Sequence, residues 1–290
     1  MTAKPIALTR AELDRHKLPP VIAANKDERG KLLVVAGSRN TPGSAVICAT
    51  AAMRSGCGKV SIATVESMAP HIALAVPEAL VLGLTETRQG GFARSAIETV
   101  AERALDVDAV VVGPGMKQSK LCSKLAERML RLNLPALVLD AAMLYALPPH
   151  EGDARDAARP ILLPHNREMG ALLDCDPDEV DKDPLGCGLG CASRYDAFTL
   201  VKGAQSHIVT PDGRVWKYRG GGPGLGISGS GDALAGILGG LLARGADPLS
   251  ALLWAVWLHG EAGAALGRKV GEIGFLARHI SAEVPALLPS

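Results

Sequence analysis

The residues KLLVVAGS, at positions 31–38, form a continuous apolar run that stops at a glycine. Such a run is typical of a β-strand that is buried on both faces of a parallel sheet. Pro42 is well placed to open a helix, and the alanine-rich residues 43–55 predict one that ends near Gly56 and Gly58. Residues 60–64 then predict a second strand, which completes a βαβ unit of the usual right-handed kind.

The alternation of strands and helices continues to the end of the chain. Two apolar runs on either side of the turn sequence PDG, at positions 211–213, predict a β-hairpin. This order predicts a doubly wound α/β fold, in which a mostly parallel sheet lies between two layers of helices. The further expected strands are 108–112, 135–140, 160–165, 198–203, 207–210 and 214–218, and the expected helices are 93–104, 121–132, 167–173, 187–197, 231–243, 248–266 and 273–287.

Composition limits the class of protein. The 290 residues have a formal net charge of +1 and no basic block, which argues against a nucleic-acid-binding surface. The longest apolar stretch, residues 251–258, is too short to span a bilayer and predicts a buried helix. Residues 1–5 lead into no apolar signal segment, and the six cysteines form no zinc-binding set with histidine. We therefore expect a cytoplasmic protein with reduced thiols and no structural metal site.

Polar residues and glycines follow several of the expected strands. In open parallel sheets, ligands bind outside the carboxyl ends of the strands, so these residues predict a site along one edge of the sheet. The strand ends in question are Gly37-Ser38, Gly113-Pro114-Gly115, Asp140, Pro164-His165 and Lys202-Gly203.

A glycine-rich loop, GGGPGLGISGSGD at positions 220–232, precedes an apolar helical run. The free N–H groups at the start of a helix bind anions, and glycines allow the backbone to approach a phosphate closely. Asp232 closes this loop, where a carboxylate would repel phosphate unless it has a chemical task. It could accept the proton of a substrate hydroxyl as the oxygen attacks phosphorus. The alternative is a mobile surface loop in which Asp232 only caps the helix.

The other polar strand ends leave two interpretations open. Lys202 could meet a nucleotide phosphate or be solvated, and His165 could contact a substrate or have no functional role. Asp140 closes a buried strand, so its charge must be paired or linked to a metal. The chain has no Walker-type P-loop and no GxGxxG sequence after its first strand, which argues against P-loop and dinucleotide-binding Rossmann proteins.

The ordered motifs give the chain a resemblance to a known family. It resembles the ADP- or ATP-dependent NAD(P)H-hydrate dehydratases of the ribokinase-like superfamily, from about Leu18 to the C-terminus. More particular to that family than to sugar kinases are LVVAGS at 33–38, PGSA at 42–45, AMRSGCG at 52–58 and WLHGEAG at 257–263. The shared motifs are VVGPG at 111–115, LDA at 139–141, PH at 164–165, VKG at 201–203 and GSGD at 229–232.

The resemblance implies a three-layer ribokinase-like fold in a single domain, with residues 1–30 as an N-terminal arm. It implies repair of the S epimer of hydrated NADH or NADPH, using ADP or ATP with Mg²⁺, by a homo-oligomer such as a tetramer. Asp232 is the implied catalytic base. The implied substrate-binding residues are Ala45, Gly115, His165 and Asp232, and the implied nucleotide-binding residues are Lys202, Gly203, Ala204, Gln205, Ser206, Gly229, Ser230 and Gly231.

The chain departs from the family on the substrate side, where PHNRE at 164–168 stands in place of the usual PHPGE. Two other functions therefore stay open at this point. One is a small-molecule kinase of the same superfamily, acting on a sugar or vitamin precursor. The other is a nucleotide-binding protein without catalytic activity, although such a protein has no need of an acid beside phosphates.

Overall fold

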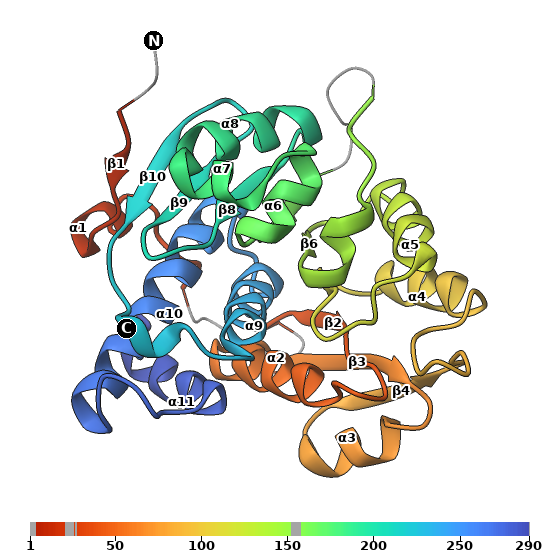
Figure 1. The fold of residues 1–290 in the computed structure, drawn as a ribbon. Helices are drawn as coiled ribbons and strands as arrows, with labels where there is room; N and C mark the ends of the chain where they lie inside the picture. Colours follow the sequence, from red (N-terminus) through yellow and green to blue (C-terminus); the bar gives the residue numbers. More distant parts are fainter. Residues whose placement is uncertain (1–3, 21–25, 27, 152–157, 290) are drawn as a thin grey trace.

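The computed structural model describes residues 4–20, 26, 28–151 and 158–289. Within these residues, ten strands form one sheet in the order β1-β10-β9-β8-β7-β6-β5-β2-β3-β4 (Figure 1). β9 is antiparallel to β8 and β10, and the other neighbouring pairs are parallel. The mostly parallel sheet and the β9–β10 hairpin confirm the prediction from the sequence. The strands are β1 Ile6–Ala7, β2 Lys31–Val35, β3 Lys59–Val65, β4 Leu80–Leu84, β5 Ala109–Val112, β6 Leu137–Leu139, β7 Ile161–Leu162, β8 Phe198–Val201, β9 Ser206–Val209 and β10 Val215–Tyr218.

Helices cover both faces of the sheet (Figure 1). Leu32 and Val34 of β2 belong to the apolar core beneath α2, α9, α10 and α11, whereas Leu33 and Val35 face α4, α5 and α6. All four side chains are fully buried, which confirms the strand predicted to be buried on both faces. The helices are α1 Arg10–Leu13, α2 Gly43–Arg54, α3 Ala69–Ala75, α4 Ala96–Ala104, α5 Lys120–Leu130, α6 Asn166–Leu173, α7 Pro177–Lys182, α8 Pro184–Tyr195, α9 Ser230–Ala243, α10 Pro248–Lys269 and α11 Ala277–Leu287, with 3₁₀ turns η1 Ala141–Ala146 and η2 Pro223–Leu225.

The predicted N-terminal arm is described in part, because residues 1–3, 21–25 and 27 lie outside the described residues. β1 pairs with β10 at the edge of the sheet. The buried Glu12 of α1 accepts a hydrogen bond from Trp216 Nε1 at 3.0 Å, and Trp254 Nε1 donates to the carbonyl oxygen of His16 at 2.6 Å. These buried bonds fasten the arm to the body of the protein. The division of the chain into one domain and an arm stays a prediction.

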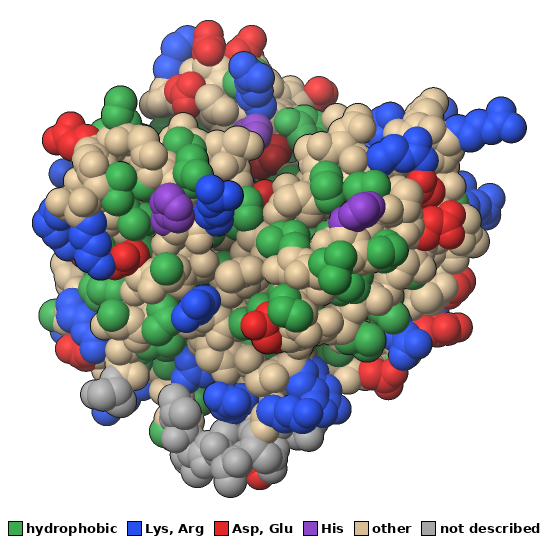
Figure 2. All heavy atoms as spheres, turned by 90° about the horizontal axis from the view of Figure 1, so that it is seen from below, with side chains coloured by type: hydrophobic (Ala, Val, Ile, Leu, Met, Phe, Trp, Pro, Cys, Tyr) green, Lys and Arg blue, Asp and Glu red, His purple; other side chains and the backbone are tan. Residues whose placement is uncertain are grey.

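α10 is long and apolar enough to cross a membrane, but most of its residues are buried within the protein. Ala251 through Val256 pack in the core together with α9. The helix is therefore a core helix, as the sequence predicted for residues 251–258. On the face shown in Figure 2, acidic, basic and hydrophobic side chains are interspersed, at the rim and near the centre.

α9 packs tightly against α2, although the two helices are far apart in the sequence (Figure 1). A Cβ added at Gly236 of α9 would lie 2.1 Å from the carbonyl oxygen of Cys48 and 2.9 Å from Ala51 Cβ. Such distances cannot be accommodated without moving one helix. The glycine therefore sets the position of α9, and with it the position of the residues at the start of α9.

We expect Gly236→Ala to lower the free energy of unfolding by about 1–3 kcal/mol, because it overpacks this contact. Urea unfolding would measure the change. The matched control is Gly190→Ala on α8, where an added Cβ would meet only Leu173 Cδ2, at 3.9 Å. That control should stabilise the protein by roughly 0.5–1 kcal/mol, because alanine favours a helix more than glycine does. Equal stabilities of the two variants would contradict the close packing of α9 on α2.

Candidate active site

The glycine-rich loop leads directly into α9, as predicted. Gly229 adopts a left-handed conformation with φ of +88°, and the helix begins at Ser230. Gly229 has no side chain with which to cap the helix. The Ser230 N–H donates to the Ile227 carbonyl oxygen at 3.2 Å, and the first helical bond is that from the Ala233 N–H, so the N–H groups of Gly231 and Asp232 are left as potential anion ligands. Asp232 lies in this same first turn, at the positive end of the helix dipole.

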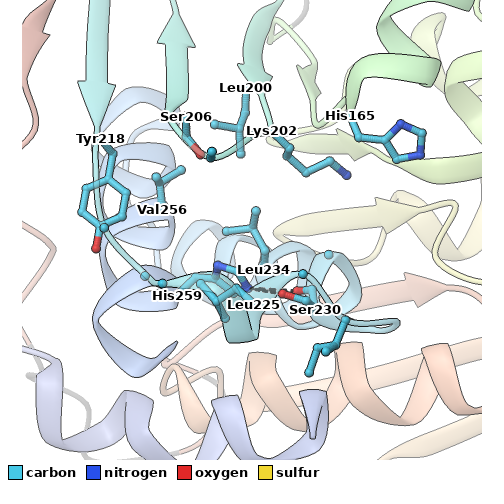
Figure 3. A pocket seen from close by; sticks show the side chains of 18 of the residues that line it. His165, Leu200, Lys202, Ser206, Tyr218, Leu225, Ser230, Leu234, Val256 and His259 are labelled. Carbon is cyan, nitrogen blue, oxygen red and sulfur yellow. Dashed lines mark hydrogen bonds between the residues drawn. The ribbon is translucent and has the colours of Figure 1, made fainter. Parts of the chain in front are cut away.

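A pocket of about 900 Å³ lies between this loop and the carboxyl end of β8 (Figure 3). Lys202 and His165 enter it from the sheet side, opposite Ser230 and His259. Apolar side chains lie among these polar groups, for example Leu200 beside Lys202 and Leu234 beside His259. Of the predicted nucleotide-binding residues, Lys202, Gly203, Ala204, Ser206, Ser230 and Gly231 line the pocket, whereas the other two, Gln205 and Gly229, both within the described residues, do not.

Of the predicted substrate-binding residues, His165 lines the pocket, whereas Ala45, Gly115 and Asp232, all within the described residues, do not. Gly115 has a φ of +63°, and a Cβ added there would lie 2.5 Å from Ser44 Cβ, so only glycine fits. Ala45 is fully buried beside Ser44, and its N–H donates to the Pro42 carbonyl oxygen at 3.2 Å. The roles of these residues as ligands stay predictions.

Asp232 has the environment of a base that is poised to take a proton. Burial raises the pKa of its carboxyl group, and the nearby charge of Asp140 raises it further. A hydrogen bond from Ser44 and the charge of Lys202 act in the opposite direction but do not cancel the rise. A carboxylate with a raised pKa is a stronger base than an exposed aspartate.

Lys202 is the centre of a buried cluster of charges. Its Nζ lies 2.8 Å from Asp140 Oδ1 and 3.7 Å from Glu168 Oε2. Burial alone would lower the pKa of Lys202, but the charges of the two carboxylates outweigh it and raise the pKa. Asp140 is only 2% exposed, so the structure resolves the choice that the sequence left open: its charge is paired with a lysine. This lysine therefore keeps its charge and faces the pocket.

Glu168 was missed by the sequence reasoning, and it ties His165 to the cluster. Its side chain accepts from the His165 N–H at 2.9 Å, while His165 Nδ1 accepts from the N–H groups of Arg167 and Glu168. The two residues form a capping box at the start of α6. Burial raises the pKa of Glu168, because the charge of Lys202 offsets only part of the desolvation. The signal available in the sequence was a glutamate three residues after His165, which is the spacing of a capping box.

The turn after β5 brings Gly113 against the cluster. Gly113 has a φ of +126°, and a Cβ added there would lie 1.8 Å from the carbonyl oxygen of Asp140. The next glycine, Gly115, accepts a hydrogen bond from Thr41 Oγ1 at 2.6 Å through its carbonyl oxygen. The glycines of the GPG sequence thus allow the segments that follow β2, β5 and β6 to meet at one place.

Comparisons with known proteins agree with this geometry. A family model described as NAD(P)H-hydrate dehydratase matches residues 32–286. The chain is 42% identical to an ADP-dependent (S)-NAD(P)H-hydrate dehydratase of Xanthomonas campestris pv. campestris, over 99% of this chain and 98% of that protein. It also matches bifunctional NAD(P)H-hydrate repair enzymes, for example from Moorella thermoacetica, of which it spans about half the length.

Solved structures are similar over almost the whole chain. An ADP/ATP-dependent NAD(P)H-hydrate dehydratase from Bacillus subtilis, co-crystallized with ATP/Mg²⁺, has a TM-score of 0.85 at 27% identity and covers 98% of this chain and 97% of its own. A ribokinase-like superfamily protein from Enterococcus faecalis V583 has a TM-score of 0.80 at 20% identity, with 97% and 94% covered. The likeness to the Enterococcus faecalis protein shows the fold alone. This is the ribokinase-like fold expected from the family resemblance.

Proposed function

Because the chain belongs to the NAD(P)H-hydrate dehydratase family, we propose that it restores hydrated NADH or NADPH by ADP-dependent dehydration of the S epimer. The observation that carries this proposal is the place of Asp232: a buried carboxylate in the first turn of α9, beside an uncapped anion site and a charged lysine. A binding protein without chemistry gains nothing from a carboxylate that repels phosphate.

The proposed reaction has two steps. Asp232 takes the proton of the ring hydroxyl while the hydroxyl oxygen attacks the terminal phosphorus of ADP. This step produces AMP and a phosphorylated ring. Phosphate then departs from the ring carbon, a proton leaves the neighbouring carbon, and the double bond of the reduced cofactor returns. The N–H groups of the α9 first turn and the ammonium of Lys202 stabilise negative charge on the phosphoryl oxygens. ATP in the same role would leave ADP.

Magnesium fits this site as a companion of the nucleotide. Asp140, Glu168 and Asp232 place three carboxyl groups around one lysine, and this excess of negative charge suits a cation. Within the described residues, no cluster of three or more ligating side chains forms a metal cage, so Mg²⁺ would arrive on the nucleotide phosphates, and Asp140 and Glu168 would favour it through their charge while they stay paired with Lys202. When bound, it neutralises charge on those phosphates.

The test is to incubate the protein with hydrated NADH, Mg²⁺ and either ADP or ATP, and to follow the return of the near-ultraviolet absorbance of the reduced nicotinamide. We expect recovery that requires nucleotide, together with release of inorganic phosphate and AMP or ADP in equal amounts. No recovery with either nucleotide would refute the proposal. A stable phosphorylated product without dehydration would indicate a kinase instead.

We further propose that the enzyme is cytoplasmic and homo-oligomeric. Six free cysteines among the described residues support a reducing compartment. The long apolar helix α10 is mostly buried in the protein core. Light scattering of the purified protein would test the oligomer, and a monomer at micromolar concentration would contradict it.

A further inference from the structure

His259 belongs to the motif WLHGEAG at 257–263, and the proposed chemistry assigns it no role. The residue lies on α10, and its imidazole ring lines the pocket opposite Lys202. In Figure 3 the ring points at Ser230, the first residue of α9, and a hydrogen bond joins the two. A side chain from one helix thus contacts the anion-binding turn of another.

The two contacts of His259 indicate which ring nitrogen carries the proton. Nε2 lies 3.0 Å from Ser230 Oγ and 3.1 Å from the carbonyl oxygen of Ser230. A carbonyl oxygen only accepts, so Nε2 must carry the hydrogen, since a lone pair there would face the carbonyl oxygen and be repelled. Nε2–H then donates to both oxygens. The Ser230 hydroxyl accepts this bond and keeps its own hydrogen for another acceptor.

The ring is held in this state by its surroundings. Burial, together with the charge of Lys202, lowers the pKa of His259 to about 4, although the bond to the Ser230 carbonyl oxygen acts in the opposite direction. The imidazole is therefore neutral at physiological pH. Its helix is fixed at the next residue, because a Cβ added at Gly260 would lie 2.2 Å from Tyr218 Oη, and Tyr218 Oη donates to Glu261 at 3.0 Å.

We propose that His259 is a positioning residue, which holds the first turn of α9 and orients the Ser230 hydroxyl as a hydrogen-bond donor to the phosphoryl oxygens. This inference rests on the proposed function for its catalytic consequence, but the nucleotide alone is enough to test it. Ser230 is buried and lines the pocket, so a donor there would face a bound phosphate rather than bulk water.

A double-mutant cycle separates this role from a purely structural one. The variants are His259→Leu, Ser230→Ala and the two together, with kcat, KM for ADP and thermal unfolding measured for each. We expect His259→Leu and Ser230→Ala each to lower kcat by about 10- to 100-fold. Because the histidine acts through the serine, the double variant should be slower than the worse single variant by no more than about twofold. His71→Leu, at an exposed position on α3, is the matched control and should retain the wild-type rate.

Conservative variants test the tautomer. The amide of His259→Gln can place a neutral N–H donor near the position of Nε2, and this variant should keep the rate to within about threefold. The amide of His259→Asn is too short to do so and should behave as the leucine variant does. If His259→Leu fails to fold, the asparagine variant takes its place in the cycle. Multiplicative losses in the double variant, or a folded glutamine variant as slow as the leucine variant, would overturn the proposal.

Calorimetry with ADP and Mg²⁺ distinguishes failure of this inference from failure of the proposed function. If the wild-type protein binds ADP but returns no NADH, the proposed function is wrong. The role of His259 is then judged by the affinity for ADP. Each single variant should weaken this affinity by about 3- to 10-fold, and the double variant should weaken it no further than the worse single variant. Unchanged affinity would overturn the inference, and a wild-type protein that binds no nucleotide would overturn both.

Discussion

Asp232→Asn is expected to lower kcat by about 10²- to 10⁴-fold, which is the usual worth of a general base. The amide keeps the size of the side chain but cannot accept the proton of the ring hydroxyl. Its position in the first turn of α9 is unchanged, so calorimetry should show ADP binding to within a few fold of the wild type. The matched control, Asp106→Asn, changes an exposed aspartate between α4 and β5 and should leave both quantities unaltered.

The pH dependence provides a second measurement of the same assignment. The carboxyl group must be ionised to act as a base, so kcat/KM falls as the pH drops through its pKa in the free enzyme. Because burial raises that pKa, the loss of rate should begin at a higher pH than it would for an aspartate of ordinary pKa 3.8. Asp232→Asn should remove this limb of the profile. A variant with the wild-type rate and profile would refute Asp232 as the base.

The parts of the fold that could be predicted from the sequence are those buried on both faces. β2, β5 and β6 are continuous apolar runs because each lies between two helical layers. Such runs are typical of strands buried on both faces of a parallel sheet. β4 was missed although Leu80–Leu84 reads LVLGL: Gly83 interrupts the apolar run, and the strand lies at the edge of the sheet with most of its residues at least partly exposed. α7 was missed because Val180 is its one buried residue, which is too little for a helical period.

The site divides in the same way. Lys202, His165 and Asp232 were identified because they follow strands or the glycine loop, where local sequence marks a binding edge. Their partners could not be found, since partnership depends on contacts across the fold. Asp140 precedes Lys202 by 62 residues, and only the order of strands β6, β7 and β8 in the sheet brings the two side chains together. The same holds for His259, which reaches Ser230 from another helix.

Lys202→Met is expected to lower the free energy of unfolding by about 3–5 kcal/mol at neutral pH, because it leaves buried carboxylates without a partner. Methionine is unbranched and matches the aliphatic part of the lysine side chain, so packing is largely retained. The side chains of Asp140 and Glu168 are only 3% and 5% exposed, and water cannot replace the ammonium group. Chemical denaturation would measure the loss. The variant should also bind ADP weakly, since Lys202 is the cation that lines the sheet side of the pocket.

The matched control is Lys269→Met, which removes an ion pair with Glu283 at the surface. There the lysine is 63% exposed, so its loss should cost about 1 kcal/mol or less. Equal losses in the two variants would mean that the Lys202 cluster is as well solvated as a surface pair, and would contradict the burial described above.

The deficit of Lys202→Met should also depend on pH in a fixed direction. Glu168 already has a pKa above its ordinary value of 4.5, and removing the lysine, which lowers it, raises it further. A carboxyl group with a higher pKa in the folded state binds more protons when folded, so its favourable contribution is present below the unfolded pKa and lost as the pH rises through the folded pKa. The deficit should therefore shrink as the pH falls towards 4.5. Adding Asp140→Asn to Lys202→Met should restore part of the stability at neutral pH, because one unpaired charge is removed, and a further loss would contradict the unpaired charge of Asp140 as a cause of the deficit.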